Sequence, residues 1–478
     1  MPADLIPENH VIVIFGGNGD LARRKLLPAL YHLHAEGLMP RRWRIIGNSR
    51  RELEGPFDEV ARKAVEEFGR CCIDEDAWEV FASRLSYVSH DFTPADPGPL
   101  RDAVAEAERE IGGEPSRLYY LSVPPSAFGT ITDALGKSGM TDRSRVVFEK
   151  PFGVDQASFE ELDATVRRAL DEEQVYRIDH FLGKETLQNV LALRFANGMF
   201  EPIWNRGHID HVQIDVPESL GIGTRASFYE PTGALRDMVV THLLQVLSVI
   251  AMEPPTAFEP KPLLDEKAKV FESMAPVRAS DLVRGQFDGY TDLDGVAADS
   301  QTETFVAARV RVDNWRWAGV PFYLRTGKRM AASRQTVTLA FAEPPMQMFR
   351  DLPQDRLPND HLTLDLAGDE GITLSFLAKV PGPAVRLGPA RMTFSYEGSF
   401  GSEAIGPYER LLHDALMGDR TLFTRADGIA RTWELVSGVL RSPPPLHRYP
   451  QGSWGPGAAM DLIAPRRWHL PEPEPEPE

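Results

Sequence analysis

The hydrophobic pattern of the chain changes near residue 180. Before that point, short apolar segments alternate with longer amphipathic ones. The expected strands are 11–15, 43–46, 85–88, 118–123, 146–148 and 175–178, and the helical patterns include 21–36 and 159–170. Near-continuous apolar strands separated by helices are typical of a parallel sheet buried on both faces. The first part of the chain is therefore predicted to be an α/β, doubly wound, Rossmann-like sheet.

After about residue 200, apolar and polar residues alternate one by one. The alternating sets are Val212, Ile214 and Val216; Val306, Ala308, Val310 and Val312; Val337, Leu339 and Phe341; Leu362, Leu364 and Leu366; Ile372, Leu374 and Phe376; and Met392, Phe394 and Tyr396. Such alternation predicts a large, mainly antiparallel sheet with one buried face. We expect domains at 1–180 and 181–470, the second of the α+β class. The Pro-Glu repeat 471–478 is expected to be a disordered tail.

Composition narrows the class of protein. A chain of 478 residues with 42% hydrophobic content should form two globular domains. The net charge of −18 and the lack of a basic block argue against a nucleic-acid partner. The only cysteines, Cys71 and Cys72, are adjacent and are not expected to bridge. With no signal-like N-terminus and no membrane-length apolar run, we expect a cytoplasmic protein without a membrane partner.

A glycine-rich turn follows the first expected strand. Residues 16–22 read Gly-Gly-Asn-Gly-Asp-Leu-Ala and lead into a helical pattern. In this setting, glycines allow the backbone to approach a pyrophosphate at the helix N-terminus, where free N–H groups favour anions. The predicted cofactor contacts in this turn are Gly16, Asn18, Gly19, Asp20 and Leu21.

The end of the second expected strand bears on cofactor choice. An NAD site usually places a carboxylate there for the ribose 2′-hydroxyl, whereas arginine favours a 2′-phosphate. Arg50 and Arg51 therefore predict NADP, although nearby Glu52 leaves use of NAD open. Lys150 is expected at the carboxyl end of the fifth strand, the edge at which such sheets bind ligands.

The stretch 175–185 reads Val-Tyr-Arg-Ile-Asp-His-Phe-Leu-Gly-Lys-Glu. It places Asp179, His180 and Lys184 between a strand and a helix, which suits anion binding beside a proton-transfer site. Taken alone, Lys184 could equally be an exposed helix lysine. Lys328 follows a strand and is ambiguous alone.

His242 lies in the apolar stripe of a strongly amphipathic helix. A histidine in that setting is more often a core residue, but a general base also needs restricted water and a carboxylate partner, for which Asp179 is a candidate. Asp237 precedes His242 by five residues, about 140° around a regular helix, so the two are not expected to stack. We find no metal-ligand spacing and predict no metal site.

Several motifs resemble those of glucose-6-phosphate dehydrogenases. They are residues 177–185, 16–26, 149–153 (Glu-Lys-Pro-Phe-Gly), 233–238 (Gly-Ala-Leu-Arg-Asp-Met), 319–328, 408–412 and 452–456. The likeness spans nearly the whole chain, from Val11 to about Trp468. It implies oxidation of glucose 6-phosphate at C1 to a lactone with hydride transfer to NADP, the first step of the oxidative pentose phosphate pathway. It also implies a homodimer or homotetramer assembled through the large sheet, and no metal.

The resemblance also implies residue roles. His242 would take the C1 hydroxyl proton and Asp179 would orient it. The implied substrate-binding set comprises His180, Phe181 and Lys184 for the 6-phosphate and Lys150, Glu218, Asp237 and Lys328 for the sugar, while Arg50 would meet the cofactor 2′-phosphate and Lys150 would also lie beside the cofactor.

Three departures from the family pattern concern the substrate. Phe181 replaces the usual tyrosine, and a hydrogen bond to a charged group is worth roughly 1.5–3 kcal/mol, or roughly ten- to a hundredfold in binding. Val240-Thr241 replaces Gln-Asn before the histidine, and Ala226 and Glu230 replace glycine and aspartate. The alternatives are the same chemistry on another sugar or sugar phosphate, or a catalytically silent NADP-binding protein.

Overall fold

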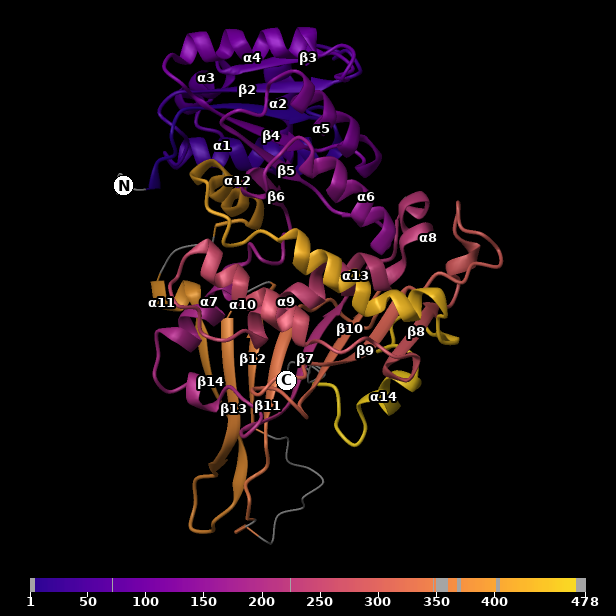
Figure 1. Ribbon diagram of the computed structural model, residues 1–478. Coiled ribbons are helices and arrows are strands. Elements are labelled where there is room, and N and C mark those ends of the chain that lie inside the picture. The colour runs from indigo at the N-terminus through magenta and orange to yellow at the C-terminus, as the bar shows by residue number, and fades with distance from the viewer. Residues whose placement is uncertain are drawn as a thin grey trace. The chain divides into compact units, whose positions relative to one another are not determined.

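The computed structural model describes residues 5–70, 72–223, 225–346, 348–349, 360–367, 371–400 and 405–469 (Figure 1). The predicted tail 471–478 lies outside these residues. The chain forms two compact units. The first comprises Met1–Lys184, Pro255–Asp265 and Ile405–Ala430, and the second comprises Glu185–Pro254, Glu266–Ala404 and Arg431–Glu478.

The first unit is built on a parallel sheet of six strands in the order β3-β2-β1-β4-β5-β6. The strands are β1 (His10–Phe15), β2 (Trp43–Ser49), β3 (Leu85–Ser89), β4 (Ser116–Leu121), β5 (Ser144–Phe148) and β6 (Val175–Arg177). All six residues of β1 are buried, because helices cover both faces of the sheet (Figure 1). This order, with its reversal between β1 and β4, confirms the predicted doubly wound fold.

The helices of the first unit follow the predicted alternation. They are η2 (Ala22–Leu26), α1 (Leu27–Ala35), α2 (Phe57–Phe68), α3 (Glu75–Ala82), α4 (Gly98–Ile111), η3 (Pro125–Ala127), α5 (Phe128–Lys137), α6 (Gln156–Arg167), η4 (Glu172–Gln174) and α12 (Pro407–Met417). Helix α12 comes from within the range predicted for the second domain. It packs on α1, where His32 Nδ1 lies 3.0 Å from Glu409 Oε2.

The second unit is built on a sheet of nine strands in the order β14-β13-β12-β11-β7-β10-β9-β8-β15. They are β7 (Ile209–Pro217), β8 (Leu282–Phe287), β9 (Phe305–Arg311), β10 (Pro321–Gly327), β11 (Thr336–Phe341), β12 (His361–Asp365), β13 (Gly371–Lys379), β14 (Leu387–Ser395) and β15 (Leu446–Tyr449). Neighbouring strands are antiparallel except for the parallel pairs β7–β10 and β8–β15. The predicted large, mainly antiparallel sheet is confirmed.

The remaining helices are α7 (Glu185–Phe195), η5 (Glu201–Ile203), α8 (Ala226–Ala234), η6 (Leu235–Leu243), α9 (Leu244–Ala251), α10 (Pro260–Ser273), η7 (Ala279–Asp281), η8 (Tyr290–Asp292), α11 (Tyr396–Phe400), α13 (Ala426–Arg441) and α14 (Ala458–Ile463). The stretch Ala226–Ala251 is apolar enough to span a membrane by composition, but 83% of its most apolar window is buried inside the protein. All eight residues of α9 are buried, as expected for a core helix.

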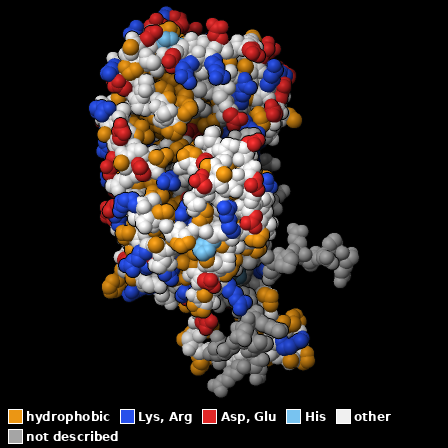
Figure 2. Space-filling view, turned by 90° about the vertical axis from the view of Figure 1, so that its right-hand side faces the viewer, with side chains coloured by type: hydrophobic (Ala, Val, Ile, Leu, Met, Phe, Trp, Pro, Cys, Tyr) orange, Lys and Arg blue, Asp and Glu red, His pale blue; other side chains and the backbone are white. Residues whose placement is uncertain are grey.

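Acidic and basic side chains are interspersed on the face drawn in Figure 2. No extended basic block is visible among the side chains coloured there, which agrees with the net charge of −18.

Candidate active site

The glycine turn after β1 is closely packed between the ends of its two neighbouring strands. Gly16 has a φ of 76°, and a Cβ there would lie 2.1 Å from the Ser122 carbonyl oxygen after β4. A Cβ on Gly17 would lie 2.8 Å from the backbone at the end of β2. The N–H groups of Gly16 and Gly17 both donate to the Asn48 carbonyl, at 2.7 and 3.1 Å. Side chains are therefore excluded, and backbone lines the edge that binds pyrophosphate in such folds.

The remaining residues of the turn lead into a helix that starts in the π form. Asn18 Oδ1 accepts hydrogen bonds from Arg23 Nε at 3.0 Å and Nη2 at 2.5 Å, and Asp20 is exposed. Leu21 directly precedes η2, which continues as α1. The predicted helix over 21–36 is thus present. Its N-terminus lies where a dinucleotide phosphate would benefit from free N–H groups.

The end of β2 carries the residues predicted to select the cofactor. Asn48 is buried and pinned by two hydrogen bonds from its amide nitrogen to backbone carbonyls, whereas Arg50, Arg51 and Glu52 are exposed. The Arg51 carbonyl accepts a 2.9 Å bond from the Tyr87 hydroxyl. Within the part of the chain that the structure describes, the Arg50 side chain makes no hydrogen bond or ion pair.

A buried carboxyl group stands beside Lys150 at the end of β5. The Tyr120 hydroxyl donates to Glu149 Oε1 at 2.6 Å, and the Tyr408 hydroxyl of α12 also bonds this carboxyl. Burial raises the pKa of Glu149, and the hydrogen bond from Tyr120 and the charge of Lys150 oppose that shift. The peptide between Lys150 and Pro151 is cis. Sequence reasoning found Lys150 but not the two tyrosines.

The segment after β6 forms a tight turn stabilised by its own acid. Asp179 is 1% exposed, and its Oδ1 accepts a 2.9 Å bond from the Phe181 N–H. The His180 and Phe181 rings are 4.9 Å apart, and Lys184 Nζ lies 5.0 Å from the centre of the Phe181 ring. Lys184 is buried, so it is not the exposed helix lysine that its sequence context also allowed. A Cβ on Gly183 would lie 3.0 Å from a backbone oxygen at the start of α12.

In the second unit, Glu218 and Lys328 follow the carboxyl ends of the parallel neighbours β7 and β10. Lys328 Nζ donates to Glu218 Oε2, and the two side chains are 7% and 30% exposed. The backbone is fixed by Glu218 N–H to Gly327 O at 2.8 Å and Lys328 N–H to Thr304 O at 2.8 Å. The Tyr449 hydroxyl donates to the Lys328 carbonyl at 2.7 Å. Parallel pairing thus unites two predicted residues that are far apart in sequence.

Helix η6 carries Asp237 and the fully buried His242. The expectation that they point about 140° apart is wrong, because η6 is a π-helix and not a regular helix. Its hydrogen bonds span five residues, as in Leu244 N–H to the Val239 carbonyl. Positions five apart are therefore one turn apart on the same side. A side-chain bond with the same spacing, from Thr241 Oγ1 to the carbonyl of residue 236 at 2.9 Å, accompanies it.

The start of η6 depends on Gly233 and Glu303. Gly233 has a φ of 68°, and a Cβ there would lie 2.6 Å from Glu303 Oε1. This carboxylate oxygen accepts from the Leu235 N–H at 3.2 Å, and Oε2 accepts from Arg284 Nε at 3.1 Å. The glycine therefore lets a buried carboxylate cap the helix that carries His242.

Comparison with known proteins identifies the family. Residues 13–189 match "Glucose-6-phosphate dehydrogenase, NAD binding domain", and residues 191–469 match "Glucose-6-phosphate dehydrogenase, C-terminal domain". The chain belongs to the glucose-6-phosphate dehydrogenase family. The glucose-6-phosphate 1-dehydrogenase of Chlamydia pneumoniae is 40% identical over 95% of this chain and 94% of its own. That of Mycolicibacterium smegmatis is 42% identical over 96% of this chain and 97% of its own.

Solved structures of family members share the fold. The crystal structure of glucose-6-phosphate 1-dehydrogenase from Mycobacterium avium is 40% identical with a TM-score of 0.86, over 98% of this chain and 99% of that one. A glucose-6-phosphate dehydrogenase in complex with its substrate glucose-6-phosphate is 33% identical with a TM-score of 0.89, at the same coverage. The family includes a nicotinamide-dinucleotide-binding domain, which coincides with the six-stranded sheet.

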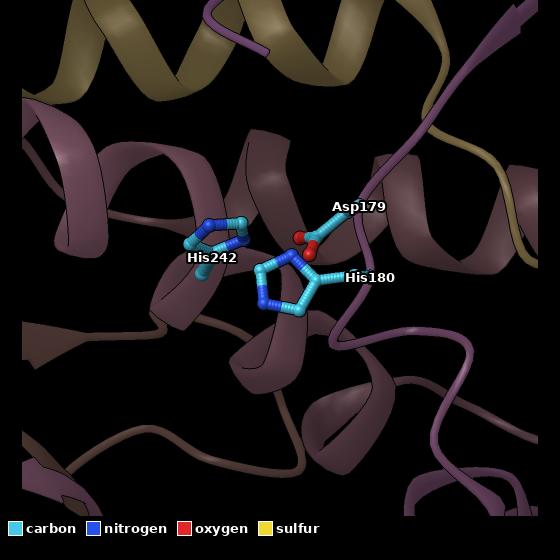
Figure 3. A group of neighbouring side chains, drawn as sticks. All are labelled: Asp179, His180 and His242. Atoms are coloured by element: carbon cyan, nitrogen blue, oxygen red, sulfur yellow. The ribbon is translucent and has the colours of Figure 1, made fainter. Parts of the chain in front are cut away.

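The site residues predicted from the family motifs fall into two groups, one in each unit. The first unit holds Gly16, Asn18, Gly19, Asp20, Leu21, Arg50, Lys150, Asp179, His180, Phe181 and Lys184, and the second holds Glu218, Asp237, His242 and Lys328. Figure 3 labels Asp179 and His180, which follow β6, and His242, which lies on η6. The pairing of Asp179 with His242 stays a prediction.

Tyr229, on α8, is a further residue that the sequence reasoning missed. Its ring centre lies 5.9 Å from Lys328 Nζ, and Asp237, Glu303 and Glu218 are its charged neighbours. It stands next to Glu230, one of the positions at which this chain departs from the family pattern. Nothing in the local sequence indicates the contact with Lys328, because Tyr229 reaches it only by packing in the apolar cluster that also contains Tyr323 of β10.

Proposed function

We propose that this protein oxidises glucose 6-phosphate at C1 to the lactone and passes the hydride to NADP. The observation that carries the proposal is the near-full-length identity of about 40% to enzymes named glucose-6-phosphate 1-dehydrogenase. It is supported by the two side-chain groups described above. Lys150, Asp179 and Lys184 follow strands at the carboxyl edge of the parallel sheet in the first unit. Glu218 and Lys328 follow the carboxyl ends of two parallel strands in the sheet of the second unit.

The residues at the carboxyl edge of the first sheet fit a dinucleotide. The glycine turn has no room for a Cβ at Gly16 or Gly17, which leaves backbone facing that edge. The exposed guanidinium of Arg50 suits a 2′-phosphate, which NADP has and NAD lacks. Bound NADP would supply the hydride acceptor. The protein's part is to hold its phosphates by backbone N–H groups and by Arg50.

His242 is proposed as the general base and Asp179 as the carboxylate that orients it. Burial of His242 restricts water, as a neutral imidazole base requires. The proton of the C1 hydroxyl would move to the imidazole while the C1 hydrogen leaves as hydride. His180 and Lys184 are proposed to bind the 6-phosphate, and the buried ammonium of Lys184 is a compact charge suited to it. Lys150, Glu218, Asp237 and Lys328 would bind the sugar hydroxyls.

One observation favours a second candidate, the same chemistry on another sugar or sugar phosphate. Phe181 packs between His180 and Lys184 but has no hydroxyl to offer a phosphate. Steady-state rates with glucose 6-phosphate, free glucose and amino-sugar phosphates, each with NADP and NAD, separate the two candidates. The proposal expects glucose 6-phosphate to have the highest kcat/KM. If it ranks among the poorest substrates, the named substrate is wrong.

Two variants test the mechanism and the cofactor. His242→Asn should abolish turnover while the affinity for NADP, measured by titration, stays near that of the wild type. Arg50→Ala should raise KM for NADP roughly tenfold or more and leave KM for NAD unchanged. Wild-type turnover by the first variant would exclude His242 as the base. NADP binding without turnover of any sugar by the wild type would instead indicate a silent NADP-binding protein.

We further propose a cytoplasmic homodimer or homotetramer assembled through the large sheet. Large apolar side chains near its β13–β14 edge are exposed: Val385 by 67%, Met392 by 58% and Phe400 by 70%. Exposed apolar groups gathered at a sheet edge are typical of an interaction surface. Light scattering of the pure protein tests this, since a monomer at micromolar concentration would contradict it.

A further inference from the structure

Tyr229 is a buried phenol whose hydroxyl lacks a partner. The residue is 4% exposed and its ring packs in an apolar cluster with Tyr290, Tyr323 and Tyr449. Across the described ranges of the chain, its hydroxyl makes no hydrogen bond. Most buried polar groups in proteins are bonded, so an orphan hydroxyl requires a reason.

Neighbouring phenols of the same cluster are satisfied. The Tyr290 hydroxyl donates to Glu230 Oε2 at 2.7 Å, and the Tyr449 hydroxyl donates to the Lys328 carbonyl at 2.7 Å. The cluster therefore does accommodate hydrogen-bonded tyrosines. Phenylalanine at position 229 would fill the same space without leaving a polar group unpaired.

One ammonium and three carboxylates surround Tyr229. Lys328 Nζ lies 5.9 Å from its ring centre, and the carboxylates of Asp237, Glu303 and Glu218 act on it. Burial first, then these carboxylates, raises the pKa of Tyr229 well above its usual value, so the phenol keeps its proton. The phenol is therefore a neutral donor with three carboxylates in its surroundings.

These acceptors differ in how they are supplied with donors. Glu303 accepts from Arg284 Nε and Nη2, at 3.1 and 3.0 Å, and from the Leu235 N–H at 3.2 Å. The Glu218 side chain depends on Lys328, its one partner among the described residues. An ammonium has three N–H donors, so a ligand removes the donor from Glu218 only when it draws the Lys328 side chain to a new position.

We propose that Tyr229 is a positioning residue of the sugar site, whose hydroxyl supplies Glu218 with a donor when the Lys328 ammonium moves to bind the sugar hydroxyls. This inference rests on the proposed function. Opening the ion pair would otherwise leave the partly buried Glu218 carboxylate, 30% exposed, without its partner, which costs stability. The phenol acts through Glu218 because its own hydroxyl is enclosed and does not reach solvent.

Tyr229→Phe in the full-length enzyme tests the proposal. We expect KM and the directly measured Kd for glucose 6-phosphate to rise about tenfold, as for a lost hydrogen bond to a charged group. We expect kcat and KM for NADP to stay within about twofold of the wild type. The unfolding temperature should be equal or higher, because an unpaired polar group is removed. If the Tyr229 hydroxyl had only a structural role, Tyr229→Phe would lower the unfolding temperature and leave KM for glucose 6-phosphate unchanged.

Tyr290→Phe is the matched control. It removes a bonded hydroxyl from the same cluster and should lower the unfolding temperature while KM for glucose 6-phosphate stays unchanged. The double variant Tyr229→Phe/Glu218→Gln tests whether the Tyr229 hydroxyl acts through Glu218. The effect of the phenol on KM should disappear in the Glu218→Gln background, because an amide does not require the same donor.

The outcomes are distinct. A wild-type enzyme that oxidises glucose 6-phosphate and a Tyr229→Phe variant with unchanged KM would overturn this inference alone. Additive effects of Tyr229→Phe and Glu218→Gln on KM would also overturn it, since the phenol would then not act through Glu218. A wild-type protein that neither binds nor oxidises glucose 6-phosphate would overturn the proposed function, and the inference with it.

Discussion

Lys328 and Glu218 form an ion pair at the carboxyl ends of two adjacent parallel strands, although 110 residues of chain separate them. Register sets this contact, because β10 and β7 run side by side with Gly327 opposite Pro217. In a sheet of otherwise mostly antiparallel strands, this pair brings two strand ends to one place. Ligand-binding residues gather at such ends because both following loops emerge there.

Replacing the ammonium should therefore weaken sugar binding specifically. For Lys328→Met we expect KM for glucose 6-phosphate to rise roughly ten- to a hundredfold, with KM for NADP unchanged. Lys137→Met is the control, because Lys137 is exposed and pairs with Asp133 across one turn of α5. Lys137→Met should change the free energy of unfolding by only about 0.3 kcal/mol and leave kcat and KM unchanged. An unchanged KM in the first variant would remove Lys328 from the sugar site.

Gly233→Ala should destabilise the second unit. A methyl group there would lie 2.6 Å from Glu303 Oε1, in a backbone region that L-residues rarely adopt. We expect a loss of roughly 2 kcal/mol or more and reduced turnover, because Glu303 would be displaced from the start of the helix that carries His242. Thermal unfolding and steady-state rates measure both effects.

Gly438→Ala is the control for that substitution. Gly438 lies inside α13, and a Cβ there meets no atom within 4 Å. Alanine is favoured over glycine within a helix, so this variant should gain about 0.5–1 kcal/mol. Equal effects of the two alanines would contradict the steric argument.

Tyr120→Phe and Tyr119→Phe form a pair of variants in one strand. Tyr120 donates to the buried Glu149 carboxyl at 2.6 Å, whereas Tyr119 donates to the Met140 carbonyl at 3.0 Å. Loss of a bond to a buried carboxyl should cost roughly 1.5–3 kcal/mol, and loss of the neutral bond about 1 kcal/mol. We expect the unfolding midpoint of Tyr120→Phe to be the lower. The reverse order would argue that Glu149 is uncharged and fully supplied by Tyr408.

His10 should make the first unit sensitive to acid. Burial lowers its pKa from 6.5 to about 4, and the backbone bond to Glu8 and the charge of Arg145 modify that shift. Because the folded pKa is the lower one, the unfolded chain binds the proton first, and stability present above pH 6.5 is lost as pH falls toward 4. Between pH 7 and 5 this loss is about 2 kcal/mol.

A His10→Gln variant removes that titration. Its unfolding midpoint should fall less between pH 7 and pH 5 than that of the wild type, whatever its stability at pH 7. Equal pH dependence of the two proteins would show that the imidazole does not titrate in this range.

The same residues show how far prediction from sequence reaches. The strands of the first unit were predictable because they are short, nearly continuous apolar segments. The glycine turn was predictable because only glycine tolerates the φ of 76° at Gly16 so close to Ser122. The relative orientation of Asp237 and His242 on η6 was not predictable, because no local sequence pattern indicates π-helical hydrogen bonding. The contact of Tyr120 with Glu149 depends on the pairing of β4 with β5.

The sequence by itself determined which elements form and which chemistry they carry, because hydrophobic period, glycine positions and motif residues are local properties of the chain. Only the tertiary structure decided which distant residues share a site. The ion pair of Lys328 with Glu218 follows from strand register, the burial of Lys184 from the turn after β6, and the orphan hydroxyl of Tyr229 from packing in a dense core. Such contacts reflect the free energy of the whole fold, which no short stretch of sequence encodes.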